Sequence, residues 1–102
     1  MIYIVDIDGT ICSIEFDSDG QVDYSKTKPY MDRIEKLNKL YDEGHEIHYY
    51  TARGSKSGID RTAITEQQIK EWGAKFHTLK LKKPHYDLWI DDKSIHPDQF
   101  FK

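Results

Sequence analysis

The 102-residue sequence predicts one α/β domain, residues 1–102, built around a parallel sheet. Short apolar runs alternate with segments that have helical periodicity, and a glycine ends each of the two longer helical segments. Polar clusters follow the apolar runs directly. Strands that alternate with helices are joined by right-handed crossovers, which makes the sheet parallel. We therefore expect a Rossmann-like sheet of about four strands in the order 4-1-2-3, flanked by helices.

The first half of the chain supplies two strands and one helix. Residues 2–5 form a short apolar run typical of a buried parallel strand, and residues 46–50 form a second. Between them, residues 13–28 are polar and contain an Asp-Ser-Asp-Gly turn signal, which predicts a hairpin-like flap. Pro29 opens a helix that ends at Gly44, with apolar side chains at helical spacing: Ile34, Leu37, Leu40 and Tyr41.

The second half predicts two more strands. A helix over roughly residues 60–72 ends at Gly73, and a third strand follows over residues 76–81. Residues 87–90, Asp-Leu-Trp-Ile, are expected to form the fourth strand. Pro97 begins a final helical turn.

Composition narrows the classes of partner. The net charge of −3 gives no overall basic surface, which argues against nucleic acid as a partner without excluding it. The single cysteine, Cys12, cannot form an internal disulfide, as expected in a reducing cytosol. No signal peptide and no membrane-spanning run is visible, so we expect a cytoplasmic protein without a membrane partner.

Polar side chains follow all four predicted strands. Ligands bind parallel sheets at the carboxyl ends of the strands, so these side chains are expected to meet at one rim. They are Asp6 and Asp8 after the first strand, Thr51 after the second, Lys82 and Lys83 after the third, and Asp91 and Asp92 after the fourth.

Crowded carboxylates repel one another unless a cation lies among them. Oxygen ligands suit Mg²⁺, which often also contacts a substrate phosphate. Asp6 and Asp8 are two residues apart, so in extended backbone their side chains point the same way. An isolated Asp-x-Asp is more often a solvated turn. Its position after a buried strand, together with the second acidic pair, favours a site.

Four motifs in order resemble those of the haloacid dehalogenase superfamily. Asp-Ile-Asp-Gly-Thr at residues 6–10 resembles the first motif, and Thr51 in Tyr-Thr-Ala-Arg resembles the second. Lys83, followed by proline, resembles the third, and Trp-Ile-Asp-Asp at residues 89–92 resembles the fourth. The motifs span nearly the whole chain, so the resemblance implies the superfamily's fold as well as its chemistry.

The resemblance implies roles for the carboxylates. Asp6 would be the nucleophile that forms an aspartyl-phosphate, and Asp8 the general acid and then the base. Mg²⁺ would be held by Asp6, the backbone carbonyl of Asp8 and the fourth-motif pair, with Asp92 favoured as direct ligand and Asp91 as support. An aspartate at the position of Asp8 argues for phosphate ester hydrolysis over dehalogenation.

The resemblance also implies a phosphate-binding set. Thr51 and the backbone amides around Ile7 and Ala52 would bind phosphate oxygens, and Lys83 would neutralise their charge. Arg53 follows directly and has two open interpretations, a substrate clamp or a structural partner of the acidic cluster. Lys83 is favoured over Lys82 as the motif lysine because a proline follows it.

No cap domain fits the two usual insertion points, since residues 11–28 hold only a flap and residues 82–86 barely a turn. The chain then resembles small capless phosphatases of capsule and lipopolysaccharide sugar biosynthesis, and less closely the phosphatase half of polynucleotide kinase–phosphatases. The expected function is Mg²⁺-dependent hydrolysis of a small phosphomonoester, with a sugar phosphate favoured and a polynucleotide end as the alternative. A receiver-like phospho-accepting domain and an inactive interaction module are alternatives of another class. An open site also leaves room for a homo-oligomer.

Overall fold

The computed structural model describes all residues, 1–102, and shows a small three-stranded parallel sheet. Its strands are β1 (Ile2–Val5), β2 (Glu46–Tyr50) and β3 (Thr78–Lys80), in the order β1-β2-β3. Tyr3 pairs with Ile47 and Tyr49 with Leu79. The parallel α/β fold is confirmed, and so is the relative order of the first three predicted strands.

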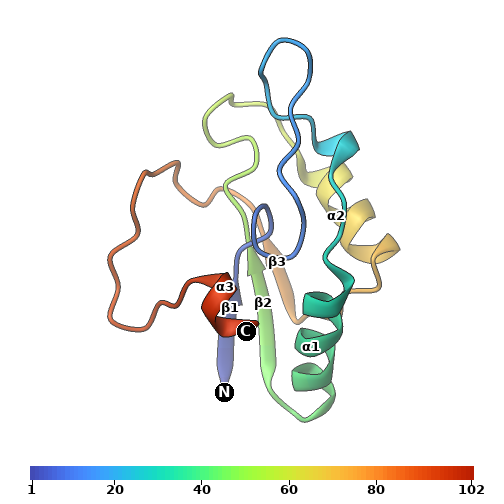
Figure 1. Cartoon of the computed structure of the whole chain (residues 1–102), viewed down its shortest axis with the longest axis vertical. Helices are drawn as coiled ribbons and strands as arrows, with labels where there is room; N and C mark the ends of the chain where they lie inside the picture. The colour runs from blue at the N-terminus through green and yellow to red at the C-terminus, as the bar shows by residue number, and fades with distance from the viewer.

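Helices α1 (Met31–Asp42) and α2 (Thr62–Glu71) pack against one face of the sheet (Figure 1). Alternate β2 side chains, Ile47 and Tyr49, point to this face and are fully buried. Helical spacing brings Ile34 and Leu37 of α1 into the same core. The buried cluster also contains Val5, Ile7, Ile11, Cys12, Ile69 and Ala74.

The short helix α3 (Pro97–Phe100) lies beside β1 (Figure 1). The Phe100 ring packs edge-on against Tyr3, with ring centroids 6.0 Å apart. Arg33 of α1 forms an ion pair with Asp98 at 2.9 Å, so α3 is held against the first helix as well. The end of the chain is therefore fixed to the body of the domain.

The predicted hairpin-like flap is present between β1 and α1. Phe16 and Val22 form an antiparallel bridge, and the Gly20 amide donates to the Asp17 carbonyl across the turn. A short 3₁₀ helix, η1 (Tyr24–Lys26), completes the flap before the chain enters α1. In this region the turn residues alone were enough to predict the structure.

The prediction of a fourth strand over residues 87–90 is wrong. These residues belong to a connection without strand structure, and every residue from 84 to 96 is exposed. Two of its apolar side chains, Leu88 and Ile90, are 76% and 88% exposed. The physical reason is the short connection from β3, because a parallel crossover normally needs a dozen or more residues.

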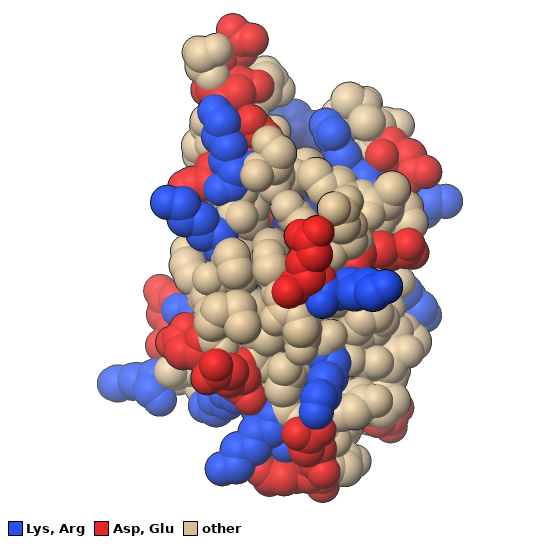
Figure 2. All heavy atoms as spheres, turned by 90° about the vertical axis from the view of Figure 1, so that its right-hand side faces the viewer, with Lys and Arg blue, Asp and Glu red and all other residues tan.

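The surface over the helices carries both signs of charge. Figure 2 shows Lys and Arg side chains interspersed with Asp and Glu on this face, without a region of one sign. None of the helices has the length and apolar character needed to cross a membrane.

Candidate active site

Asp6 directly follows β1 and lies at the carboxyl end of the sheet. One of its oxygens accepts a hydrogen bond from the Thr10 hydroxyl at 3.1 Å. The other lies 3.6 Å from the Lys83 ammonium. Burial raises the pKa of Asp6 above its ordinary value of 3.8, and the charge of Lys83 partly opposes the shift. The side chain is still 37% exposed, so a substrate can reach it.

A tight turn after β1 positions both aspartates. The amides of Thr10 and Ile11 donate to the Ile7 carbonyl, and the Gly9 amide donates to the Cys12 carbonyl. Gly9 has φ +80°, a left-handed conformation that most side chains disfavour. The glycine and threonine of the Asp-x-Asp-Gly-Thr motif therefore have local structural roles, the first in the turn and the second on Asp6.

Asp8 is held by Arg53 in a two-pronged ion pair. The guanidinium donates from Nε to one carboxylate oxygen at 3.0 Å and from Nη2 to the other at 2.9 Å. The Arg53 side chain is fully buried, whereas Asp8 keeps 20% of its side chain exposed. This geometry fixes the orientation of the Asp8 carboxylate.

The remaining Arg53 contacts anchor the guanidinium from α2 and the flap. Its Nη1 donates to the Thr65 hydroxyl at 3.2 Å and to the Gln68 side-chain oxygen at 2.7 Å. The guanidinium also lies over the Tyr24 ring, 4.5 Å from its centroid. Of the two interpretations of Arg53, these contacts match the structural partner of the acidic cluster, since each guanidinium nitrogen already donates to a protein acceptor.

Thr51 and Ala52 follow β2, and the strand register places them beside the end of β1. The Thr51 hydroxyl accepts the Arg53 amide at 3.1 Å and donates to no protein acceptor. The Ala52 amide has no protein acceptor either. The Ala52 amide, in a half-buried residue, is available to an oxyanion at the rim, whereas Thr51 is buried, with 1% of its surface exposed.

Lys83 reaches the same rim from the segment after β3. Its amide donates to the Thr51 carbonyl at 3.1 Å, and its carbonyl accepts the Ser55 hydroxyl at 2.6 Å. Its side chain is 12% exposed and approaches Asp6. Lys82, by contrast, is exposed, so Lys83 is the lysine that the structure places beside Asp6.

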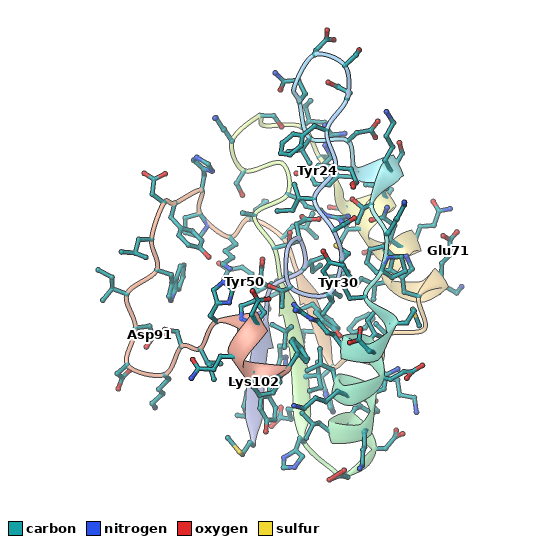
Figure 3. The ribbon with its side chains drawn as sticks, in the orientation of Figure 1. Tyr24, Tyr30, Tyr50, Glu71, Asp91 and Lys102 are labelled. Carbon is teal, nitrogen blue, oxygen red and sulfur yellow. The ribbon has the colours of Figure 1, made fainter.

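The structure does not bring the second acidic pair to the rim. Asp91 is bonded only within its own segment, to Lys93 and Ser94, and lies on the outer part of the loop (Figure 3). Asp92 follows it and is exposed. No group of three His, Cys, Asp or Glu side chains lies close enough to hold a metal ion. Within a single chain, the predicted magnesium ligands Asp6 and Asp8 therefore lie apart from the other two, Asp91 and Asp92.

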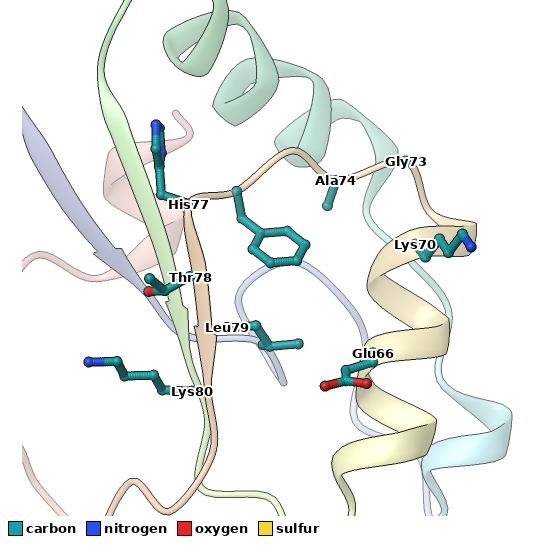
Figure 4. Close-up of a pocket in the computed structure, with 9 residues that line it drawn as sticks. Glu66, Lys70, Gly73, Ala74, His77, Thr78, Leu79 and Lys80 are labelled. Carbon is teal, nitrogen blue, oxygen red and sulfur yellow. The ribbon is translucent and has the colours of Figure 1, made fainter.

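A hollow on the surface lies elsewhere. It measures about 820 Å³ and is bounded by α2, the residues after it and β3. Figure 4 shows Leu79 pointing into it, with Glu66 and Lys70 on the opposite wall. None of the predicted site residues lines this hollow. The candidate site is therefore the rim, where Asp6, Thr51 and Lys83 meet.

The sequence did not indicate which residues hold Arg53 and surround the two aspartates. Tyr24, Thr65 and Gln68 hold Arg53, and no local pattern marks them because they come from the flap and from α2. Cys12 is a further member, with its thiol 3.5 Å from an Asp8 oxygen. Burial raises the pKa of Cys12 to about 12, so the thiol stays neutral, as expected for a buried cysteine.

Comparisons with known proteins bear mainly on the fold. No protein-family model matches the chain, and no curated protein matches it. Among solved structures, a crystal structure of a Vibrio cholerae protein is similar, with 26% sequence identity and a TM-score of 0.81. The alignment covers 98% of this chain and 86% of the other. The arrangement of the chain is thus shared with a crystallised protein over nearly its whole length.

Proposed function

We propose that the protein is a phosphomonoester hydrolase that works through an aspartyl-phosphate on Asp6. The observation that carries the proposal is the surroundings of this side chain. Asp6 is a partly exposed carboxylate with a hydroxyl donor on one oxygen and an ammonium 3.6 Å from the other. Thr51 and Ala52 add two free donors at the same rim. An anion with several oxygens fits such a set of donors.

In the first step an Asp6 oxygen attacks phosphorus, and the bond from phosphorus to the ester oxygen breaks. Asp8 supplies a proton to the leaving oxygen. In the second step water attacks phosphorus, Asp8 takes a proton from it, and Asp6 is regenerated as phosphate leaves. Lys83 and the free donors of Thr51 and Ala52 stabilise the charge on the equatorial oxygens throughout.

The fixed geometry of Asp8 is compatible with proton transfer. Each carboxylate oxygen accepts one hydrogen bond from Arg53; Oδ1 also lies 3.5 Å from the Cys12 thiol, whereas Oδ2 retains a second lone-pair direction. Arg53 therefore acts as a positioning residue, which keeps the carboxylate from turning away from the rim. No step is assigned to Mg²⁺, because Asp91 and Asp92 lie apart from Asp6 in the single chain.

A small substrate, with a sugar phosphate favoured, follows from the open rim and the resemblance to capless phosphatases. The segments before α1 and after β3 form only a flap and a loop of exposed residues, which supports a site without a cap domain. An open site does not exclude water and makes few contacts with the leaving group, so it selects poorly among substrates. We therefore propose broad, weak activity on small phosphate esters for the isolated chain.

The proposal can be tested by measuring the turnover of an aryl phosphate with and without Mg²⁺. The two variants compared are Asp6→Asn and the exposed control Asp32→Asn. A carboxamide cannot form an acyl phosphate, so Asp6→Asn should lose essentially all turnover while keeping its circular dichroism spectrum. Asp32→Asn should match the unmodified protein. Normal hydrolysis by a verified Asp6→Asn sample would show that Asp6 is not the nucleophile. A stable aspartyl-phosphate without turnover would instead favour a phospho-accepting signalling domain.

A further inference from the structure

The segment of residues 84–96, here called the protruding segment, makes almost no contact with its own domain. All of its residues are exposed, and residues 84–95 form no hydrogen bond with the rest of the chain. Figure 1 shows it extending out on the side of β1, as a wide loop from β3 to α3. Its main contact is at the rim, where the Tyr86 and Trp89 rings lie 5.1 and 5.4 Å from the Lys83 ammonium.

The sheet has a matching free edge at β1. This strand pairs only with β2, so the backbone groups on its other side have no strand partner. Ile2 and Ile4 point to the face away from α1 and α2 and are 65% and 66% exposed. A strand edge with unpaired N–H and C=O groups beside exposed apolar side chains is a template for another strand.

The protruding segment has the pattern that such an edge requires. Leu88 and Ile90 are two residues apart and mostly exposed, like Ile2 and Ile4 of β1. In a strand these two side chains point to one face, so they can continue the apolar row formed by the two isoleucines. Pairing would satisfy both sets of backbone groups and partly cover the four side chains through cross-strand contacts.

The segment cannot reach this edge in its own chain while Lys83 stays at the rim. Four Cα steps, from Lys83 to Asp87, span at most about 13–14 Å. To lie parallel beside β1, the chain must move three strand spacings sideways, past β2 and β1, and return about four residues along the sheet. That straight line is already about 19–20 Å, before any detour around the sheet. A second copy removes this restriction, because its segment need not start at the same rim.

We propose that two copies of the chain exchange their protruding segments, so that residues 87–90 of each copy pair in parallel with β1 of the other. The exchange is reciprocal, as in a two-fold symmetric dimer with swapped elements. It gives up the contacts of Tyr86 and Trp89 with Lys83, which involve half-exposed rings. It also carries the acidic pair Asp91–Asp92 of one copy to the rim that holds Asp6 of the other.

Molar mass and cysteine cross-linking test the exchange without reference to activity. Light scattering after gel filtration should give a dimer. The double variant Ile4→Cys/Ile90→Cys, and its two-residue register alternative Ile4→Cys/Leu88→Cys, should include one pair that forms a disulfide between chains under mild oxidation. The control Met31→Cys/Ile90→Cys also has two exposed sites, but Met31 is at the start of α1, and it should remain uncrosslinked.

Each result decides the proposal. An interchain disulfide in either double variant that carries Ile4→Cys, absent from the control, supports the exchange. A disulfide within one chain would show that the segment folds back on its own β1, and a monomer without cross-links would show that the edge stays free. Both results overturn the proposal. A dimer that survives Ile90→Asp with unchanged mass also overturns it, because the interface then lies elsewhere.

A complementation experiment tests the shared site and rests on the proposed function. Asp6→Asn should be inactive alone, and Asp92→Asn should keep only the weak activity of a rim without the acidic pair. When they are refolded together, mixed dimers should contain one site with both wild-type residues, and activity should return to about a quarter of the unmodified level. No recovery, in a sample that cross-links between chains, contradicts the shared site but leaves the exchange intact. Full activity of Asp6→Asn alone contradicts the proposed function instead.

Discussion

Replacing Arg53 with methionine is expected to destabilise the protein strongly. The change keeps much of the side-chain volume but removes the only cation that contacts Asp8, at 2.9 and 3.0 Å. Arg53 is fully buried, so its contacts are shielded from water. Removing one partner of a buried ion pair typically costs about 3–5 kcal/mol, because the other charge is left without compensation.

The structure places the expected cost at the lower end of this range. Asp8 is 20% exposed and can regain some water, while Thr65 and Gln68 keep other hydrogen bonds, to the carbonyls of Arg61 and Tyr24. We therefore expect a loss of about 3 kcal/mol. For a domain of this size, that corresponds to a fall in melting temperature of roughly 12–24 °C. Arg53→Lys retains a charge without the planar fork and should cost about half as much.

Urea unfolding followed by circular dichroism measures this change, with the slope m as a check that the folded state stays compact. Arg61→Met is the matched control. Its guanidinium lies over the same Tyr24 ring, 5.3 Å from the centroid, but forms no ion pair. We expect this control to cost less than about 1 kcal/mol. A double-mutant cycle with Asp8→Asn should give a coupling energy of about 1.5 kcal/mol or more.

A loss of less than about 1 kcal/mol in the free energy of unfolding of Arg53→Met, with an unchanged slope m, would refute this prediction, since breaking a buried ion pair costs more. A coupling energy near zero would also refute it, because the destabilisation would then come from lost packing rather than from Asp8.

Three further outcomes follow from single residues. Burial raises the pKa of Asp6 in the folded state, so the free energy of unfolding should fall as pH rises from 3.8 through the folded-state pKa. Asp6→Asn should remove this fall and should melt at a higher temperature than the unmodified protein at pH 7. Calorimetry over a range of pH measures both effects. Lys83→Ala should lower the turnover rate about 10²–10³-fold, whereas Lys82→Ala should leave it nearly unchanged, as measured by steady-state kinetics. The reverse result would show that Lys82, and not Lys83, acts at the rim. Gly54→Ala should destabilise the loop more than Gly58→Ala in urea titrations; both glycines have positive φ, but only at Gly54 would a methyl group collide with a backbone carbonyl.

The elements with strong local signals could be predicted from the sequence. Apolar residues at helical spacing between a proline and a glycine mark α1, because a helix that buries one face requires this pattern. The apolar run before Asp6 marks β1 in the same way, and parallel topology then places Asp6, Thr51 and Lys83 at one rim. These inferences depend on periodicity and chain order, which are properties of the sequence itself.

Only the tertiary structure decided how Asp8 is held and where residues 87–90 lie. Asp8 and Arg53 are 45 positions apart, and their pairing depends on how α2 and the flap pack around the guanidinium, which no local pattern encodes. Residues 87–90 have a strand's side-chain pattern, yet a strand forms only where a free edge lies within reach. The length of chain after Lys83 determines that reach. In the single chain, residues 87–90 therefore form no strand despite their side-chain pattern, and the free edge of β1 has no strand partner.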